Sequence, residues 1–270
     1  MLMEIVGEKI NTTRKSVRKA VEERNTTFIQ DLARKQSEAG ATYLDVNSGL
    51  ALYPEEEAAD FAWLVPTIQA VVDVPLCIDS GRKEAIEAAL KLHKGPAMIN
   101  SVNGDPESMD MVFPLAKEYE CKVIALTSSR EGKIPATSAE RLTIAEKIGI
   151  EAQNHGISLE NIYFDPLVMP ISTDNNNALL FLETVREIKQ TFNTAKTISG
   201  LSNISFGLPN RQLLNHVFLI LSLGFGMDAA ILDPTDKSIM AMVLATETMV
   251  GKDAYCTQYI QAYKDGRLDV

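Results

Sequence analysis

Residues 42–81, TYLDVNSGLALYPEEEAADFAWLVPTIQAVVDVPLCIDSG, hold two short apolar runs separated by one long amphipathic stretch. The runs TYLDVNS (42–48) and PLCIDSG (75–81) are rich in Val, Ile and Leu and predict strands, whereas Glu55–Val71 has helical periodicity. The acidic residues that follow Pro54 suit the first turn of that helix, because the helix dipole favours negative charge there. A helix between two buried strands is typical of a parallel βαβ unit.

The same alternation continues on both sides of this unit and occurs eight times. The other predicted strands are EIVGEKI (4–10), AMINSV (97–102), KVIALTS (122–128), IYFDPLV (162–168), KTISGLSN (196–203) and AAILDP (229–234). The other predicted helices are Thr26–Glu38, Lys83–Leu92, Pro106–Tyr119, Ala139–His155, Asn177–Phe192, Gln212–Leu223 and Lys237–Val250, with Ala254–Lys264 as a further terminal helix. Eight alternations without a Pro-, Gly- or Ser-rich linker predict one domain, residues 1–270, folded as a single (β/α)8 TIM barrel.

Composition excludes several classes of protein. The net charge of −10 argues against nucleic-acid binding, which depends on Lys and Arg that neutralise phosphates. No apolar run reaches the length of a membrane span, and the first residues lack the pattern of a signal peptide, so we expect a cytoplasmic protein without a membrane partner. Cys77, Cys121 and Cys256 form no CxxC pair, which argues against a disulfide framework and a structural zinc site.

Polar residues stand at or just after the ends of most predicted strands. They are Glu8, Asn11, Asp45, Asn47, Asp79, Asn100, Asp165, Asn203 and Asp233. A single Asp or Asn at such a position is most simply a helix cap or a turn residue. Because a barrel brings all its strand ends to one mouth, where active sites of this fold are built, the set together predicts a ring of site residues.

The ring has carboxylates and amides but no His, Lys or Cys at a strand end, which argues against a nucleophile–base pair or a Schiff base. Carboxylates suit a ligand with several ring N–H donors on one edge, such as the 2-amino-4-oxo edge of a pterin. They also suit Mg²⁺ or Mn²⁺, and composition alone leaves both uses open. His93, His155 and His216 share no spacing, so we assign them to packing or the surface and predict no bound metal.

The strand-end blocks also carry a family signature. The blocks GEKIN, DVNSG, IDS, MINS, FDPLV and SGLSNIS, followed by NRQLLNHVFL and GMDAAI, resemble in order and spacing the methyltetrahydrofolate:corrinoid methyltransferases of the pterin-binding barrel group. The resemblance covers nearly the whole chain. Dihydropteroate synthase and the folate domain of methionine synthase share this fold and part of the pocket, so the assignment to a pterin protein has the broader support.

The resemblance implies roles for individual residues. Asp79, Asn100 and Asp165 would hold the pterin edge, and Asn203 would lie near N5 as the catalytic residue. The residues that would shape the adjoining wall or the pocket floor are Gly200, Ser202 and Arg211, and more weakly Glu8, Asn11, Asp45 and Asn47. For Asp45 and Asn47 a structural role is an equal alternative.

The resemblance further implies the substrate, the partner and the assembly. A methyl group would move, in either direction, between N5 of tetrahydrofolate or 5-methyltetrahydrofolate and the cobalt of a corrinoid (cobalamin). None of the three His residues lies in a DxHxxG-like element, so the corrinoid should arrive on a partner protein that docks at the barrel mouth. The family also implies a homodimer.

Two departures from the family pattern affect the pocket. Gly81–Arg82 follows IDS, which leaves the contacts of the third loop open, and Phe206–Gly207 follows GLSNIS. Phe206 would either make a more apolar lid, and so change the corrinoid partner or the preferred direction, or pack under its own loop.

Three alternatives remain at this point. A dihydropteroate synthase-like pterin enzyme needs a strand-end Lys where this chain has GLSN (200–203), which weighs against it. A non-catalytic folate-binding or corrinoid-docking subunit would bind folate without methyl transfer. A barrel enzyme that uses a divalent metal would show metal-dependent activity. The physiological direction of transfer is not determined by the sequence.

Overall fold

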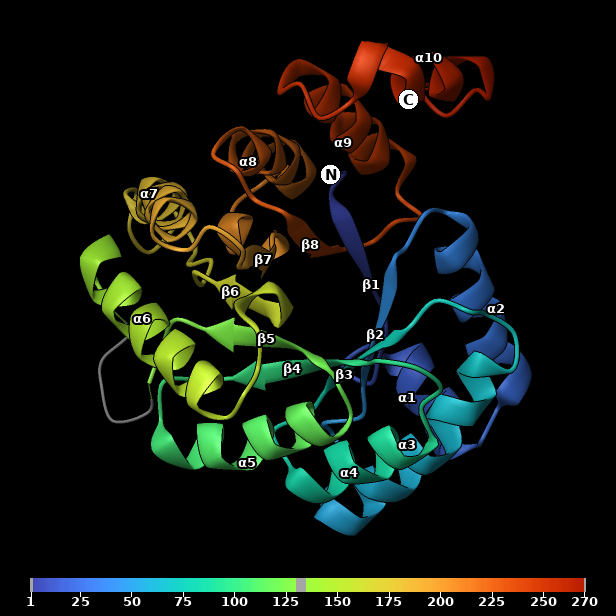
Figure 1. Ribbon diagram of the computed structural model, residues 1–270. Coiled ribbons are helices and arrows are strands. Elements are labelled where there is room, and N and C mark those ends of the chain that lie inside the picture. The colour runs from blue at the N-terminus through green and yellow to red at the C-terminus, as the bar shows by residue number, and fades with distance from the viewer. Residues whose placement is uncertain (1, 130–134, 270) are drawn as a thin grey trace.

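Eight parallel strands close into a barrel in chain order, from β1 to β8 (Figure 1). The computed structural model describes residues 2–129 and 135–269. The strands are β1 (Glu4–Asn11), β2 (Tyr43–Asn47), β3 (Leu76–Asp79), β4 (Met98–Val102), β5 (Lys122–Leu126), β6 (Ile162–Asp165), β7 (Lys196–Gly200) and β8 (Ala229–Leu232). The predicted TIM barrel is confirmed.

Helices surround the barrel and follow the strands in sequence. They are α1 (Lys15–Glu22), α2 (Thr26–Glu38), α3 (Pro54–Gln69), α4 (Lys83–Leu92), α5 (Pro106–Glu118), α6 (Ser138–Asn154), α7 (Asn177–Thr191), α8 (Arg211–Gly224), α9 (Lys237–Met249) and α10 (Thr257–Lys264). The described residues also contain the 3₁₀ turns η1 (Leu159–Asn161), η2 (Ser202–Ser205) and η3 (Ala254–Cys256). Among residues 2–129 and 135–269, no helix is both long and apolar enough to cross a membrane.

The predicted elements differ from the structure mainly at the barrel mouth. Strand β6 ends at Asp165, where Pro166 has no N–H to continue the ladder, and β7 ends at Gly200. Asn203 therefore lies in η2, beyond the strand end where the sequence placed it. Helix α1 was not predicted, because its eight residues bury only a short apolar stripe that contains Val17 and Val21.

Strand residues point alternately into the barrel and toward the helices. On β2, Leu44 and Val46 join the core between strands and helices, whereas Tyr43 packs inside the barrel. Asp45 and Asn47 have the same parity as Tyr43, and successive side chains of a strand point to opposite faces. The inner core is a single cluster of Val6, Tyr43, Cys77, Met98, Ile124, Tyr163, Ile198 and Ala229.

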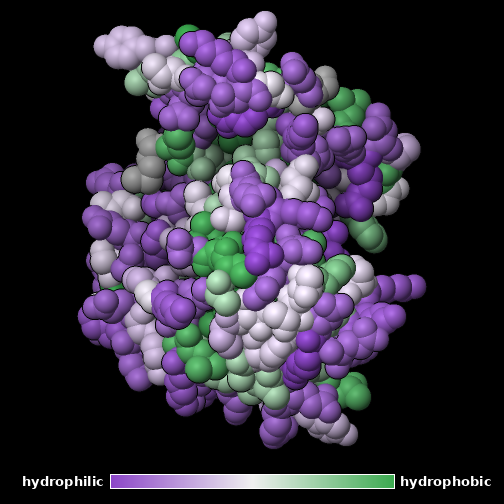
Figure 2. Space-filling view, turned by 90° about the vertical axis from the view of Figure 1, so that its right-hand side faces the viewer, coloured by the Kyte–Doolittle hydropathy of each residue, from purple (hydrophilic) through white to green (hydrophobic). Residues whose placement is uncertain are grey.

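An apolar cleft of about 820 Å³ lies between α2 and α9 and reaches β1. Leu2, Ile5, Leu32, Met240 and Val243 line it. Seen from the side of α2, the surface is mostly hydrophilic and its apolar patches are small (Figure 2). No strand-end residue of the predicted ring lines this cleft, so it is separate from the predicted site.

A layer of charged and phenolic side chains fills the end of the barrel opposite the mouth. Glu4 pairs with Lys196, accepts a hydrogen bond from the Tyr163 hydroxyl at 2.7 Å, and lies 3.8 Å from the Lys122 ammonium. Lys122 also donates to the Tyr43 hydroxyl at 2.5 Å. Burial by itself raises the pKa of Glu4, but the hydrogen bonds from Lys196 and Tyr163 and the charge of Lys122 outweigh it, so the pKa lies below its ordinary 4.5.

Replacing Glu4 by Ala is expected to lower the free energy of unfolding by about 2–4 kcal/mol, because two half-buried ammonium groups lose their shared carboxylate. The lowered pKa means that this stabilisation is present above pH 4.5 and is lost as the pH falls through the folded-state pKa. Urea denaturation of the wild type and of Glu4→Ala, at about pH 7 and about pH 4, measures both effects. A difference in stability that does not shrink at the lower pH would contradict this role of Glu4.

Candidate functional site

Four residues of the predicted ring form two neighbouring hydrogen-bonded pairs at the ends of β2, β3 and β4. Asn47, Asp79 and Asn100 are register neighbours on adjacent strands. The Asn47 amide donates to the Asp79 carboxylate at 3.0 Å, and the Asn100 amide donates to the Asp45 carboxylate at 3.3 Å. The parallel register thus brings together residues that lie up to 55 positions apart in sequence.

Asp79 and Asn100 line a cavity of about 580 Å³ in the barrel mouth. Leu126, at the end of β5, supplies an apolar wall. The remaining lining comes from β4, the loops after β3 and β4 and the first two turns of α5: Ser80, Gly81, Ser101, Asn103, Asp105, Pro106, Glu107, Ser108 and Met111. A cavity of this size is typical of sites for small organic ligands.

Asp165 stands next to this cavity, because it is the register partner of Leu126. Its Oδ1 accepts hydrogen bonds from the Ser199 hydroxyl at 2.7 Å and from the Leu167 amide at 2.8 Å. The side-chain amide of Asn203 donates to the Val168 carbonyl at 2.7 Å. The loop after β6 therefore links Asp165 to η2.

The remaining predicted wall residues form a neighbouring part of the mouth and do not line the 580 Å³ cavity. Arg211 donates to the Ser202 carbonyl at 2.6 Å and to the Ser205 hydroxyl at 3.0 Å, which fixes the turn that carries Asn203. A Cβ built on Gly200 meets no atom within 4 Å, so the backbone borders open space there. Phe206 is 61% exposed, and the interpretation that it packs under its own loop is wrong.

Three other ring residues are engaged in local contacts. Glu8 pairs with Arg14 at 2.9 Å, and the Asn11 carboxamide oxygen accepts from the Thr13 amide at 3.0 Å. Asp233 pairs with Lys9 at 2.7 Å. Asn11 thus has the turn role expected of a single polar residue, whereas Glu8 and Asp233 form ion pairs, and none of the three lines the cavity with Asp79.

Burial controls the charge of the mouth carboxylates. Burial raises the pKa of Asp79 to about 6. The hydrogen bond from Asn47 acts to lower this pKa, and the charge of Glu57 acts to raise it further. Burial also raises the pKa of Asp165 to about 6, although the Ser199 hydrogen bond opposes it. Burial and the charge of Asp79 raise the pKa of Asp45 well above its ordinary value. At neutral pH, Asp79 and Asp165 are mostly ionised acceptors, and Asp45 keeps its proton to a higher pH than an exposed aspartate.

Arg141 on α6 was missed from the sequence. Its guanidinium donates to the carbonyls of Pro166 at 2.5 Å and Leu167 at 2.9 Å, and only 1% of the residue is exposed. Its charge opposes the rise in the pKa of Asp165. A signal existed, because Arg141 precedes the buried residues Ala145 and Ile148 at helical spacing and so lies on the core-facing stripe.

Glu57 on α3 was also missed from the sequence, and its contacts explain the role of Arg82. The Glu57 carboxylate accepts from the Ser80 hydroxyl at 2.6 Å and pairs with the Arg82 guanidinium at 3.1 Å. Arg82 also donates to the Ala51 carbonyl at 3.3 Å. Of the Gly81–Arg82 departure, only Gly81 lines the cavity, and Arg82 instead ties the loops after β2 and β3 to α3.

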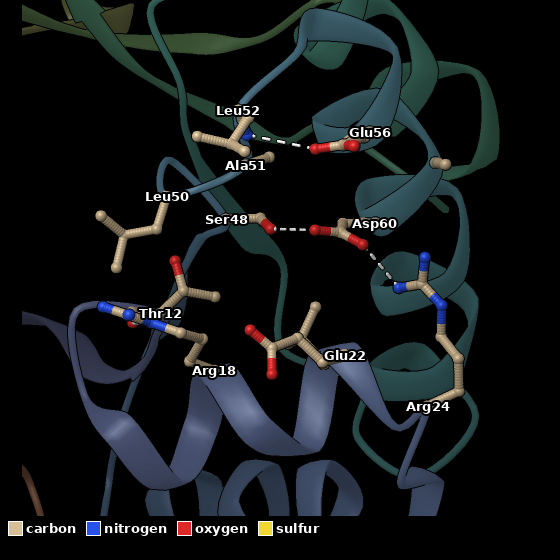
Figure 3. Close-up of a pocket in the computed structure, with 12 residues that line it drawn as sticks. Thr12, Arg18, Glu22, Arg24, Ser48, Leu50, Ala51, Leu52, Glu56 and Asp60 are labelled. Carbon is tan, nitrogen blue, oxygen red and sulfur yellow. Dashed lines mark hydrogen bonds and ion pairs between the residues drawn. The ribbon is translucent and has the colours of Figure 1, made fainter.

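A second cavity, of about 460 Å³, lies beside the mouth between α1 and the loop from β2 to α3 (Figure 3). The Ser48 hydroxyl donates to Asp60 at 2.5 Å, and Asp60 pairs with Arg24 at 2.7 Å. Arg18 and Glu22 of α1 also line the cavity, which has charged groups of both signs on its walls.

The chemistry available at the mouth is recognition of a ligand rich in N–H donors by buried carboxylates and amides. Within residues 2–129 and 135–269, no group of three or more His, Cys, Asp or Glu side chains is arranged to hold a metal ion. Asp79 and Asn100 supply such groups in the cavity, and Asp165 supplies a further carboxylate beside its Leu126 wall.

Comparison with known proteins agrees with this chemistry. A family model described as "Pterin binding enzyme" matches residues 7–233. The chain is 39% identical, over 268 residues that cover 98% of each protein, to a methylcorrinoid:tetrahydrofolate methyltransferase of Eubacterium limosum. It is 32% identical over 240 residues, 84% of this chain and 20% of the relative, to the methionine synthase of Mycobacterium tuberculosis (strain ATCC 25618 / H37Rv).

Solved structures resemble the barrel as well. Dihydropteroate synthase of Xanthomonas albilineans, in complex with indole-2-carboxylic acid and 6-chloroguanine, matches 94% of both chains with a TM-score of 0.71 and 18% identity. The same enzyme in complex with 7,8-dihydropteroate matches with a TM-score of 0.66. At this identity the likeness shows the fold alone.

Replacing Asp79 by Asn is expected to stabilise the folded protein at neutral pH. A folded-state pKa of about 6, above the ordinary 3.8, means that the folded state loses stability relative to the unfolded chain as the pH rises between these values. The introduced carboxamide keeps an oxygen that accepts from Asn47 and removes the cost of the buried charge, about 1–2 kcal/mol. Urea denaturation should show a larger gain at about pH 7.5 than at about pH 4. An equal gain in stability at both pH values would show that removal of the Asp79 charge is not the cause of the gain.

Proposed function

Because the chain belongs to the pterin-binding enzymes and, within them, to the methyltetrahydrofolate:corrinoid methyltransferases, we propose that it moves a methyl group between N5 of tetrahydrofolate and the cobalt of a corrinoid on a partner protein. The identity of 39% over 98% of both chains carries this proposal. The hydrogen-bonded carboxylates and amides of the mouth support it, because they match the donor-rich edge of a pterin.

Asp79, Asn100 and Asp165 are the proposed pterin ligands. Asp79 and Asn100 line the 580 Å³ cavity, and Asp165 lies beside its Leu126 wall. Ionised Asp79 and Asp165 can accept from the pterin ring N–H and amino groups, while the Asn100 amide can donate or accept. Asp45 and Asn47 would then orient Asn100 and Asp79 from below, through the hydrogen bonds of 3.3 and 3.0 Å.

Asn203 is the proposed catalytic residue. In transfer from folate, the bond between N5 and the methyl carbon breaks, N5 keeps its electron pair and gains a proton, and cobalt supplies the pair for the new bond to carbon. Asn203 is not an acid, so its contribution is an oriented amide that stabilises the change of charge at N5. This amide now donates one N–H to the Val168 carbonyl, which leaves its second N–H and its Oδ1 available for N5. An amide both donates and accepts, which suits either direction of transfer.

The corrinoid partner is proposed to dock at the mouth, because cobalt must approach the methyl group in line. Gly200, Ser202 and Arg211 shape the wall next to Asn203 through the 2.6 Å bond from Arg211 to Ser202. We place this chemistry in the cytoplasm. The likeness to dihydropteroate synthase extends to the fold, whereas GLSN (200–203) leaves no Lys at the end of β7 for the chemistry of that enzyme.

The test is anaerobic spectrophotometry of the purified chain with free cob(I)alamin and 5-methyltetrahydrofolate, and of the reverse mixture of methylcobalamin and tetrahydrofolate. Appearance of the methylcobalamin spectrum, or of cob(I)alamin in the reverse mixture, is expected. Folate binding without either reaction, with free or protein-bound corrinoid, would point to the non-catalytic subunit.

Two substitutions separate binding from transfer. Asn203→Ala is expected to lower kcat by about 10²–10³ and to change folate affinity little, because its contact strengthens as the charge at N5 changes. Asp165→Asn is expected to weaken folate binding, because a charged acceptor is lost. Equilibrium folate binding and saturating turnover measure both. Loss of affinity with intact turnover in Asn203→Ala would remove Asn203 from the chemistry.

A homodimer is proposed through the outer face of α8. Leu213, Val217, Ile220 and Leu221 form an exposed apolar stripe at helical spacing along this helix. Such a stripe is typical of a subunit interface. Sedimentation velocity should give twice the 29.7 kDa of the chain for the wild type, and the monomer mass for Val217→Glu. The matched control is Ile150→Glu on α6, where the replaced side chain is 61% exposed. A wild-type monomer, or a dimer in Val217→Glu, would exclude this interface.

A further inference from the structure

The loop between β2 and α3 exposes three large apolar side chains at the barrel mouth. Leu50 is 43%, Leu52 80% and Tyr53 62% exposed, and we name these three residues the lip. The lip begins three residues after Asn47, the last residue of β2, and ends where α3 starts at Pro54. Exposed apolar residues that cluster beside a binding site are typical of a protein interface.

The lip is held in place by polar contacts of its backbone and its neighbours. The Leu52 amide donates to Glu56 at 3.1 Å, and the Ala51 carbonyl accepts from Arg82 at 3.3 Å. The Ser48 hydroxyl bonds Asp60 of α3 at 2.5 Å. Because the loop is already ordered, little conformational entropy is lost when a partner binds to it. This property suits a protein-binding surface.

Helix α1 places a basic surface next to the lip. Arg14, just before α1, and Lys15, Arg18 and Lys19 of α1 are all exposed, although the chain as a whole has a net charge of −10. Arg14 pairs with Glu8, and Lys19 pairs with Glu23. Among the described residues, neither Lys15 nor Arg18 forms an ion pair. Arg18 lines the same 460 Å³ cavity as Leu50 and Leu52, and in Figure 3 its guanidinium and the Leu50 side chain extend to the same side.

The lip and Phe206 lie on different sides of the mouth. Phe206 follows β7 and is 61% exposed, and β1 and β8 separate β7 from β2 around the barrel. A body that brings cobalt to N5 must cover the mouth between them. Large apolar side chains on both sides would then be buried by the same partner.

We propose that the lip and the basic face of α1 dock the corrinoid-carrying protein, through a partner surface with an apolar patch bordered by acidic side chains. This inference rests on the proposed methyl transfer. Buried apolar anchors supply most of the binding energy of an interface, and charges at its rim raise the association rate. A free corrinoid needs neither contact, because it can enter the mouth without a protein around it.

The experiment compares two methyl donors to tetrahydrofolate. One is free methylcobalamin, and the other is the methylated corrinoid protein, purified from the source organism, that the wild type demethylates fastest. The variants are Leu52→Glu for the lip and Lys15→Glu for α1. Their matched controls are Ile150→Glu on α6 and Lys264→Glu on α10, which replace exposed residues on other helices.

Leu52→Glu is expected to lower kcat/KM with the corrinoid protein about 10-fold or more and to leave the rate with free methylcobalamin within about 2-fold. Lys15→Glu should lower kcat/KM with the corrinoid protein about 3- to 10-fold at low salt and less at high salt, because salt screens exposed charges. Both controls should behave as the wild type with both donors.

Equal activity of Leu52→Glu and wild type with the corrinoid protein would overturn the docking role. A parallel fall with free methylcobalamin, accompanied by a higher KM for tetrahydrofolate, would assign the lip to folate binding and also overturn it. The docking role would also be overturned if no corrinoid protein gave the wild type a faster methyl transfer than free methylcobalamin at the same concentration. Failure of the proposed function itself is distinct, because the wild type would then be inactive with free methylcobalamin as well.

Discussion

Closure of eight parallel strands directs every second side chain of each strand onto the barrel axis, and this constraint organises the molecule. Toward one end of the axis lies the layer of Glu4, Lys196 and Tyr163, and the apolar cluster around Cys77 and Met98 fills the middle. At the other end the strands extend beyond this apolar cluster. Inward-facing side chains there can be polar, because they do not lie within the cluster. The mouth is thus the place where the fold admits buried carboxylates.

Those carboxylates have opposite effects on stability and on binding. Burial raises the pKa of Asp79 and of Asp165 to about 6, so holding them ionised at neutral pH costs folding free energy. The same lack of solvent strengthens their hydrogen bonds to a ligand with N–H donors. Asn47 and Ser199 donate to them and offset part of the cost. A mouth built for recognition is therefore a less stable part of the barrel.

Polar residues in the first turns of the helices support the mouth. Helices that return along the outside of a parallel barrel begin at the mouth, so a polar side chain there, on the core-facing stripe, lies beneath the mouth loops. Glu57 of α3 binds Ser80 and Arg82, and Arg141 of α6 binds the carbonyls after β6. Both act on loops that directly follow the proposed pterin ligands Asp79 and Asp165, yet neither would contact the bound pterin.

The sequence determined the barrel, because eight alternations of strand and helix periodicity are local patterns, and the polar residues at the strand ends predicted a ring at the mouth. The parallel register of β2, β3 and β4 then made Asn47, Asp79 and Asn100 neighbours and gave Asp45 its hydrogen bond from Asn100. Only the tertiary structure decided that Asp233 pairs with Lys9, that Asn203 lies in a turn bonded to Val168, and that Arg141 binds the carbonyls of Pro166 and Leu167. Each of these contacts joins segments that are far apart in the chain, and such contacts leave no period in the sequence.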